Sequence, residues 1–267
     1  MSKTYRPAIA FALATLTTTY AFGQTPIRHT VINCVKVKDG KTAEFRAYLN
    51  DIAVKLYKSR VEAGEATAYV IAAAVSPTGT SARCDYHLVA TYNGVPAELN
   101  VPGKLDADLK RAGINLTADQ LTAKRDSLSA LVSRHIWRTR DSVGAGAQKG
   151  GYVRANYYKV HPGKQAEYLT AETTGWKLLA EELNKQSAGR TWSVYTLVMP
   201  GGEELAYNAM TVDGFPNWDS LMTTSPMRAL WNKVHPTLDS TAYFNHVNNI
   251  SDRPFLDVLR IVEAIRK

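Results

Sequence analysis

Hydrophobic and polar positions follow two different periods along the chain. Residues 31–37 are rich in β-branched side chains and end at a glycine turn, which predicts a strand. After that turn the apolar residues recur at intervals of four and three, the spacing of one helix face, and they are Phe45, Leu49, Ile52 and Leu56. Residues 69–75 and 86–92 again have the composition of strands. The pattern therefore predicts a strand, a helix and a two-stranded hairpin.

The same pattern returns about 123 residues later. Residues 33–45 and 156–168 are identical at seven of thirteen positions, at an offset of 123. Three further blocks match in the same order at offsets of 123, 120 and 122, namely 75–79 with 198–202, 91–96 with 211–216, and 136–141 with 258–263. A fixed period of this kind indicates an internal duplication.

Helical sequence follows each hairpin, and a last strand closes each copy. In the first copy we predict helices over 105–112 and from Thr117, where Thr117 and Gln120 have the spacing of a capping box. In the second copy the apolar residues of 218–231 form the corresponding helical region. The last strands are predicted at 135–140 and 257–265. The element order is β-α-β-β-α-β, repeated once.

A glycine-rich stretch at 141–151 separates the two copies and has the composition of a linker. The expected boundaries are a signal peptide at 1–23, a first ferredoxin-like unit at 24–143, a linker at 144–151 and a second unit at 152–267.

Each strand-to-helix junction has the form Val-x-x-Gly-Lys-x-x-Glu-aromatic, at 37–45 and 160–168. This junction and the element order resemble the dimeric α/β-barrel superfamily. The resemblance implies an α+β fold in which two tandem ferredoxin-like βαββαβ units pack their antiparallel sheets into one intramolecular barrel. It also implies a ligand pocket between the sheet and the helices of a unit.

The superfamily includes cofactor-independent monooxygenases, lactone isomerases, and haem-dependent chlorite dismutases and dye-decolourising peroxidases. Because one fold hosts many activities, the resemblance implies a pocket without deciding its chemistry.

The first 23 residues have the order of a secretory signal peptide. Lys3 and Arg6 precede an apolar stretch at 7–16, and Ala21-Phe22-Gly23 has the small-x-small form of a cleavage site. The apolar stretch is shorter than the ~20 residues that span a bilayer. We expect export to a periplasmic or extracellular location, with cleavage near Gly23, and no membrane span.

Composition narrows the class further. The chain has 267 residues, 45% of them hydrophobic, which is enough for a folded core. Two cysteines are too few for a disulfide-stapled scaffold or a zinc ribbon. Cys34 and Cys84 fall on neighbouring predicted strands, where either a disulfide or two free thiols is compatible with the sequence. The net charge of +8 is scattered and forms no basic run, so we expect no nucleic-acid partner.

Polar residues at matching strand positions are the first pocket candidates. Asn33 and Asn156 lie on a partly apolar strand face and must find hydrogen bonds, either in a pocket or across the barrel. Arg138 and Arg260 match on the last strand and can pair with a carboxylate of a ligand or of the protein.

Further candidates come from positions where the copies differ and from aromatic residues. His87 aligns with Tyr207, and His135 aligns with Asp257. Aromatic residues such as Tyr69 and Trp192 can wall a pocket for a flat ligand. The pocket candidates are therefore Asn33, Asn156, His87, Tyr207, Arg138, Arg260, Tyr69 and Trp192.

No motif assigns a catalytic residue. The six histidines form no metal-binding pattern, so we expect no metal and, most economically, no cofactor. Three hypotheses follow: an exported protein that binds a small organic ligand, an enzyme of the cofactor-independent monooxygenase or isomerase type, and a barrel that holds haem through one histidine, His235 or His246. The sequence leaves homo-oligomer formation open.

Overall fold

The computed structural model describes residues 27–94, 96, 103–202, 204–223 and 227–267, so the expected signal peptide lies outside the described residues. Unit 1 runs from β1 to β4. Its elements are β1 (Arg28–Val37), α1 (Thr42–Tyr48), the π-helical turn η1 (Leu49–Ala53), α2 (Val54–Glu62), β2 (Ala68–Ser76), the short 3₁₀ helix η2 (Gly79–Ser81), β3 (Tyr86–Asn93), α3 (Lys104–Arg111), α4 (Ala118–Leu128) and β4 (Ser129–Val143).

Unit 2 repeats this order from β5 to β8. Its elements are β5 (Tyr152–Val160), α5 (Gln165–Ala171), the π-helical turn η3 (Glu172–Trp176), α6 (Lys177–Gln186), β6 (Thr191–Met199), β7 (Ala209–Phe215), α7 (Trp218–Met222), α8 (Met227–Val234), α9 (Ser240–Ile250) and β8 (Ser251–Arg266). A π-helical turn interrupts the first helix of both units at equivalent positions.

The eight strands form one closed antiparallel barrel in the order β1-β3-β2-β8-β5-β7-β6-β4. Within each unit the last strand pairs with the first and the first with the third, as in a ferredoxin-like sheet. The pairs β2–β8 and β4–β6 join the two units. The expected fold class is therefore confirmed.

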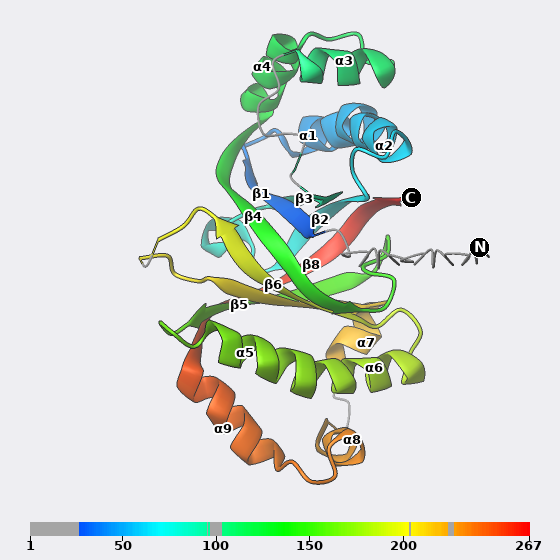
Figure 1. Ribbon diagram of the computed structural model, residues 1–267. Coiled ribbons are helices and arrows are strands. Elements are labelled where there is room, and N and C mark those ends of the chain that lie inside the picture. The colour runs from blue at the N-terminus through cyan, green and yellow to red at the C-terminus, as the bar shows by residue number, and fades with distance from the viewer. Residues whose placement is uncertain (1–26, 95, 97–102, 203, 224–226) are drawn as a thin grey trace, which may run out of the picture.

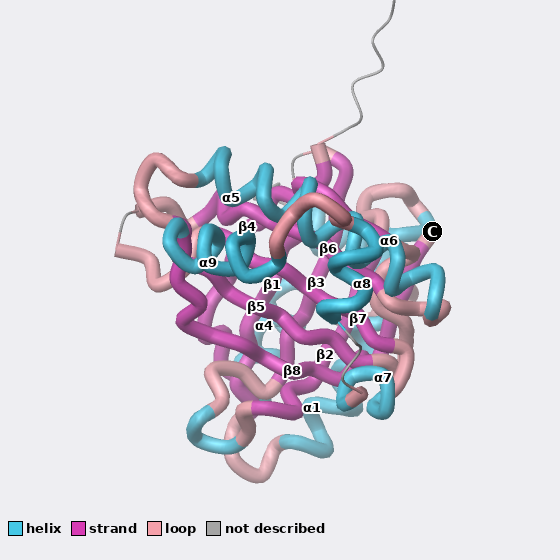
Figure 2. Tube along the Cα trace, turned by 90° about the horizontal axis from the view of Figure 1, so that it is seen from below, coloured by secondary structure: helices cyan, strands magenta, loops and turns pink. Residues whose placement is uncertain are grey.

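The helices cover the outside of the barrel in two layers. Those of unit 1 lie over one sheet, and those of unit 2 lie over the other (Figure 1). From the side of unit 2, α5, α6, α8 and α9 cross over the strands (Figure 2). Because side chains alternate along a strand, each sheet sends one set toward its helices and the other into the barrel interior, the lumen. Phe45 and Tyr168 are fully buried at equivalent positions under the two helix layers.

Local signals explain where several elements begin. The Thr117 hydroxyl accepts the Gln120 backbone N–H, and the Gln120 side chain accepts the Thr117 backbone N–H, so the predicted capping box is confirmed. The helix Ser240–Ile250 was not predicted. It begins after Asp239, whose carboxylate accepts the Ala242 N–H, but three asparagines of low helix propensity weaken its signal.

The last strand of each unit is longer than predicted, because each pairs with both units. β4 pairs with β1 over residues 129–138 and with β6 over 136–143. β8 likewise pairs with both β5 and β2. The predicted segments, 135–140 and 257–265, both include the stretch where the two pairings overlap.

The strand registers correct one part of the repeat alignment. Asn33 pairs with Leu88, and Asn156 pairs with Thr211, so the third strands correspond at an offset of 123 and not 120. The structural equivalent of His87 is therefore Met210, since these residues pair with the equivalent Cys34 and Tyr157. The alignment of His87 with Tyr207 is wrong.

Two similar dipeptides caused this error. Asn93-Gly94 ends β3, and Gly94 has a φ of +83° that suits glycine in a turn. Gly214 instead stays inside β7, where an added Cβ would lie 2.1 Å from the Thr191 hydroxyl oxygen. The first glycine is needed for backbone freedom and the second for close packing, so aligning them shifted the register.

Cys34 and Cys84 form a disulfide with a Cα–Cα distance of 5.3 Å. It joins β1 to the segment that leads into β3. In unit 2 the position of Cys34 is taken by Tyr157, so this covalent link belongs to unit 1 alone. None of the helices in the described ranges is long and apolar enough to cross a membrane.

A buried ion pair joins α2 to α3. Arg60 Nε lies 2.8 Å from Asp108 Oδ2, and their side chains are only 8% and 1% exposed. Lys104 and Arg111 also contact Asp108, at 3.4 and 2.8 Å. These contacts hold α3 against α2, beside the unit 1 pocket described below.

Replacing Asp108 by alanine should lower the free energy of unfolding by about 3–5 kcal/mol, because removing one partner leaves a buried charge uncompensated. Urea denaturation measures this loss. The exposed pair Lys58–Glu62, 4.0 Å apart, provides the control, and Glu62→Ala should change the free energy by less than about 0.5 kcal/mol. Equal losses in the two variants would contradict the structural role of Asp108.

Candidate functional site

A cavity of about 330 Å³ lies in unit 1 between the outer face of the sheet and the helices. The strands contribute Asn33 from β1, Tyr69 from β2, Leu88 from β3 and Arg134 from β4. The helical segments contribute Tyr48, Ala53, Leu56, Tyr57, Arg60, Lys104, Leu105, Leu121 and Arg125. Two of the sequence candidates, Asn33 and Tyr69, therefore lie in one pocket, at the expected place. We call this the unit 1 pocket.

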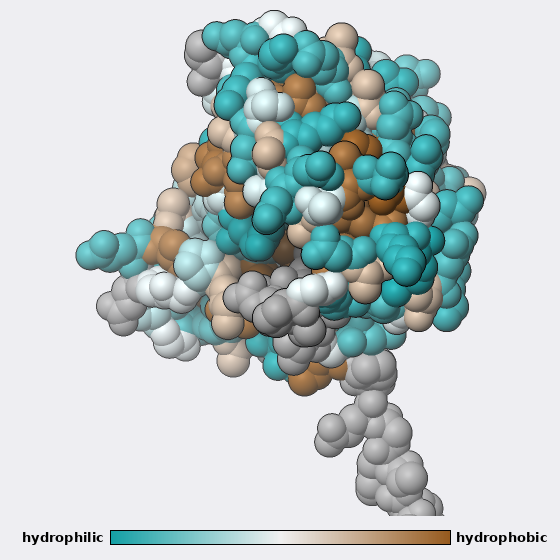
Figure 3. Space-filling view, turned by 90° about the horizontal axis from the view of Figure 1, so that it is seen from above, coloured by the Kyte–Doolittle hydropathy of each residue, from teal (hydrophilic) through white to brown (hydrophobic). Residues whose placement is uncertain are grey.

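Aromatic and aliphatic side chains form its walls. The rings of Tyr57 and Tyr69 are stacked, with centroids 3.7 Å apart and an interplanar angle of 2°. Burial raises the pKa of Tyr48, and the charge of Arg125 opposes this shift. Seen from the side of these helices, hydrophobic residues reach the surface between hydrophilic ones (Figure 3). The walls suit a flat apolar ligand.

The charged residues of the unit 1 pocket are all cationic. They are Arg60, Lys104, Arg125 and Arg134, and among the described residues of the lining none is a carboxylate. Three of them pair with carboxylates that lie outside the lining, on Asp108, Glu65 and Asp126.

Arg134 differs from the other three cations. Its Nε donates to Asn33 Oδ1 at 2.8 Å, and it has no carboxylate partner in the part of the chain that the structure describes. The amide of Asn33 thus positions a guanidinium whose charge is available to a ligand.

The corresponding pocket in unit 2 is smaller, about 210 Å³, and contains a carboxylate. Trp192, a sequence candidate, lines it together with Arg154, Arg190 and Asp213. Arg154 lies 3.2 Å from Asp213. The charges of this pocket are therefore partly neutralised from within.

Asn156 has different partners from its sequence equivalent Asn33. It is buried, and its amide donates to the hydroxyl of Thr211 and to the carboxylate of Asp213, each at 3.2 Å. Both amides thus bond to charged side chains, but Asn156 binds the carboxylate of Asp213, whereas Asn33 binds the guanidinium of Arg134. The difference follows from the neighbouring strand, where unit 1 has Leu88 at the position of Thr211.

A buried glutamate lies in η3 of unit 2. Glu172 is 1% exposed, and burial raises the pKa of its carboxyl to about 8, with Asp213 adding to the shift and the Tyr168 hydroxyl opposing it. Burial and the charge of Glu172 also raise the pKa of Tyr158 to about 12. Sequence reasoning missed Glu172, although unit 1 has Leu49 at this position. A glutamate within an otherwise apolar stripe was the available signal.

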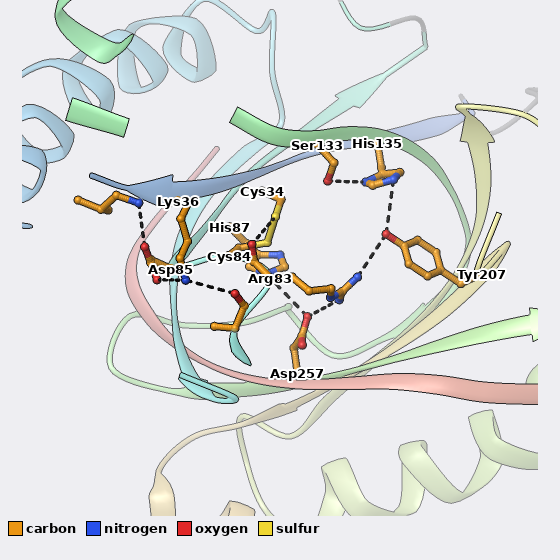
Figure 4. Close-up of a disulfide and its surroundings, with 12 residues drawn as sticks. Cys34, Lys36, Arg83, Cys84, Asp85, His87, Ser133, His135, Tyr207 and Asp257 are labelled. Atoms are coloured by element: carbon orange, nitrogen blue, oxygen red, sulfur yellow. Dashed lines mark hydrogen bonds and ion pairs between the residues drawn. A yellow bond between two sulfur atoms is a disulfide. The ribbon is translucent and has the colours of Figure 1, made fainter. Parts of the chain in front are cut away.

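A chain of polar side chains crosses one end of the lumen (Figure 4). Arg83 lies 2.6 Å from Asp257, and its other amino group donates to the Tyr207 hydroxyl at 3.3 Å. That hydroxyl lies 3.5 Å from Nε2 of His135, whose Nδ1 lies 3.3 Å from the Ser133 hydroxyl.

The hydrogen-bond directions among these polar side chains are consistent with a neutral His135. Because Tyr207 accepts from Arg83, its own proton can go to His135 Nε2, which leaves Nδ1–H to donate to Ser133. Burial, and then the charge of Arg83, lower the pKa of His135. The guanidinium of Arg83 also packs 4.6 Å from the ring centroids of Tyr157 and Phe255. Residues of both units build this cluster.

His87 lies in the lumen beside the cluster and faces away from the unit 1 pocket. Its Nε2 is 3.8 Å from Asp257, beyond hydrogen-bond distance. Burial lowers the pKa of His87 to about 4, and the Asp257 charge only partly opposes this. His87 is therefore neutral near pH 7. Arg138 and Arg260 line neither the unit 1 pocket, nor the unit 2 pocket, nor the cavity in the lumen, and Arg260 is exposed.

The two histidines considered as haem ligands, His235 and His246, each contact another group of the protein. His235 Nε2 lies 3.0 Å from the Gly175 carbonyl, and His246 Nε2 lies 3.3 Å from Glu167 at the surface. Within the described ranges, no group of three histidine, cysteine, aspartate or glutamate side chains could hold a metal ion.

No protein-family model and no curated protein matches this chain. Solved structures do resemble it. A candidate monooxygenase from Fusobacterium nucleatum aligns over 91% of this chain and 96% of its own, with a TM-score of 0.57 and 10% identity.

Two further structures have TM-scores of 0.50 and 11% identity. A candidate monooxygenase from Lactobacillus acidophilus aligns over 91% of this chain and 100% of its own, and an anthrone oxidase-like protein over 90% and 93%. At this identity the similarity establishes the fold alone, which is the dimeric α/β barrel.

The buried carboxyl of Glu172 should make stability depend on pH. Between its ordinary pKa of 4.5 and about 8, the group is protonated in the folded protein and ionised in the unfolded chain. Folding then takes up a proton, so the free energy of unfolding falls as the pH rises through this window.

From pH 6.5 to 8.5 the wild type should lose about 1–2 kcal/mol more than Glu172→Gln, as measured by urea denaturation at each pH. His87 is present in both proteins, so its titration near pH 6.5 cancels from the difference between them. Glu167→Gln, an exposed change on the preceding helix, is the control and should keep the wild-type slope. A Glu172→Gln protein with an unchanged slope would contradict the assignment.

Proposed function

We propose that the protein binds a small, flat organic anion in the unit 1 pocket. The observation that supports this most directly is the pairing of a stacked tyrosine wall with four cationic side chains in a lining whose described residues include no carboxylate. A volume of 330 Å³ falls within the range of roughly 300–1,000 Å³ typical of small-molecule pockets. A two-ring aromatic carboxylate has the matching chemistry.

Arg134 is the proposed anchor for the carboxylate. A guanidinium presents two parallel N–H donors to a carboxylate, and such charge-assisted pairs are stronger than neutral hydrogen bonds. Asn33 holds this guanidinium in place through the 2.8 Å bond to its Nε, which leaves the terminal amino groups for the ligand. The aromatic body would then pack against Tyr57, Tyr69 and Leu88.

The unit 1 pocket is the better candidate of the two. In unit 2 the carboxylate of Asp213 would repel an anion and already pairs with Arg154. The smaller volume there also leaves less room for a ligand. Duplication would thus have left ligand binding to unit 1.

A cofactor-independent monooxygenase or isomerase acting in the same pocket is the second candidate. Two structures with this fold are described as candidate monooxygenases, which favours an oxygenase over other enzymes. Oxygen uptake in the presence of an electron-rich aromatic acid distinguishes an oxygenase from a binding protein, since binding alone consumes no oxygen.

Arg134→Gln should weaken the binding of 2-naphthoate by about 10- to 100-fold, because a hydrogen bond to a charged group contributes about 1.5–3 kcal/mol. Isothermal titration calorimetry measures the affinity. Arg138→Gln, on the same strand but outside the pocket, should bind as the wild type does. An equal loss in both variants would indicate non-specific attraction of the anion, and no binding by the wild type would refute the proposed ligand class.

We further propose that the protein is exported and that the Cys34–Cys84 disulfide is formed in an oxidising compartment. Disulfides persist in such compartments and are rare in the cytosol. The N-terminal order of charged, apolar and small residues supports the same proposal.

Protein recovered from its native compartment should start at Gln24 and show no free thiol when denatured without reductant. Mass spectrometry gives the N-terminus and thiol titration gives the count. Replacing both cysteines by serine should cost about 2–4 kcal/mol of stability. An intact N-terminal segment with two free thiols would contradict export.

A further inference from the structure

The lumen of the barrel contains a second cavity, separate from both sheet–helix pockets. Its volume is about 320 Å³, and residues from all eight strands border it, with β4 contributing Thr139 and Ser142. Most of its apolar wall is aliphatic, the rings of Tyr157 and Tyr195 also border it, and the aliphatic residues are Ile32, Val70, Ala72, Val89, Val153, Ala155, Met210, Val212, Leu259 and Ile261. None of these residues lines the unit 1 pocket.

The cavity exists because side chains fill only one end of the lumen. At that end Trp137, Tyr157, Tyr207 and Phe255 pack around Arg83. Toward the other end the lining side chains are mostly small aliphatic or hydroxyl-bearing ones, and the ring of Tyr195 lies among them. His87 and Tyr157 border both regions and mark the closed end of the cavity.

Polar and cationic groups gather at the open end. Exposed lining residues there include Arg28 and Arg266. The guanidinium of Arg266 donates to the carbonyls of Ala145 and Ala147 and so fastens the segment 144–147 beside the opening. Neither arginine has a carboxylate partner among the described residues.

Hydroxyl groups also surround this end, from Thr30, Thr67, Thr91, Thr139, Ser142, Thr191 and Ser193. The hydroxyl of Thr139 is buried and has no hydrogen-bond partner among the described residues. An unpaired buried hydroxyl costs free energy that a ligand oxygen or a water could recover.

We propose that the lumen is a second binding site, which takes a medium-chain aliphatic carboxylate with its head at Arg28 and Arg266 and its chain directed toward His87. The wall is mostly aliphatic, and its described residues include no stacked aromatic pair, which favours a flexible chain over a flat ring. An apolar cavity of ~150 Å³ can already bind benzene, so this volume is sufficient for a chain of several more carbons. Because both units form the walls, the ligand would bridge them.

Decanoate is the probe, and calorimetric titration of the full-length chain is the measurement. The wild type should bind decanoate, and lumen-filling variants should bind it at least tenfold more weakly. Val89→Phe fills the cavity from β3, and Ala72→Leu fills it from β2. Arg134→Gln, which changes only the unit 1 pocket, should leave decanoate affinity unchanged, and Val89→Phe should leave 2-naphthoate affinity unchanged. The experiment therefore tests the proposed lumen site and the proposed unit 1 pocket independently of each other.

The carboxylate head is tested with a neutral analogue. Arg28→Gln should weaken decanoate binding about tenfold and leave binding of 1-decanol unchanged. In the wild type, nuclear Overhauser effects should connect the methyl end of decanoate to the methyl groups of Val70 and Val89. This last measurement needs no variant, so a folding defect in Val89→Phe would not prevent the test.

Three results would overturn the proposal. They are the absence of decanoate binding at millimolar concentration, unchanged affinity in both folded lumen-filling variants, and Overhauser contacts to Tyr57 or Tyr69 in place of Val70 and Val89. An equal effect of Arg28→Gln on decanoate and 1-decanol would exclude recognition of the carboxylate.

Discussion

Closure of the barrel is the constraint on which the rest of the structure depends. A ferredoxin-like sheet has two open edges, and an exposed edge presents unpaired N–H and C=O groups. Here the β2 edge of unit 1 pairs with β8, and the β6 edge of unit 2 pairs with β4. The two last strands extend beyond their own units to make these pairs. Every strand thereby gains two neighbours, and each side chain is assigned either to the lumen or to a helix layer.

This assignment places polar residues of the same strand in different environments. Asn33 points to the helices and holds Arg134, whereas Cys34 next to it joins the segment that carries Arg83 into the lumen. In β3, His87 enters the lumen while Leu88 lines the unit 1 pocket. A single residue of register shift would exchange these roles, so barrel closure also fixes the chemistry of both cavities.

Duplication produced two scaffolds that then diverged by a few side chains. The junctions with lysine and glutamate remain the same, because they start a helix after a turn and do not depend on a ligand. The pocket side chains differ: Leu49 corresponds to Glu172, and Leu88 corresponds to Thr211. In unit 1 the result is a cationic pocket with apolar walls, and in unit 2 it is a network of buried acids, amides and tyrosines. The same backbone thus supports opposite electrostatic environments.

The sequence by itself determined the element order, the duplication, the capping box at Thr117 and the fold class, because these depend on local periodicity and on repeated turn chemistry. It also placed Asn33 and Tyr69 on a face that lines a pocket. Only the tertiary structure brought Arg134 to Asn33, moved His87 and Tyr207 to the lumen, and set Arg138 and Arg260 apart from all three cavities. The offset of the third strand was likewise decided by Gly214 packing against Thr191, not by its resemblance to Gly94. Local sequence determines the secondary structure of each segment. Which side chains come into contact depends on strand register and barrel closure, because these arise from contacts between segments that are distant in the sequence.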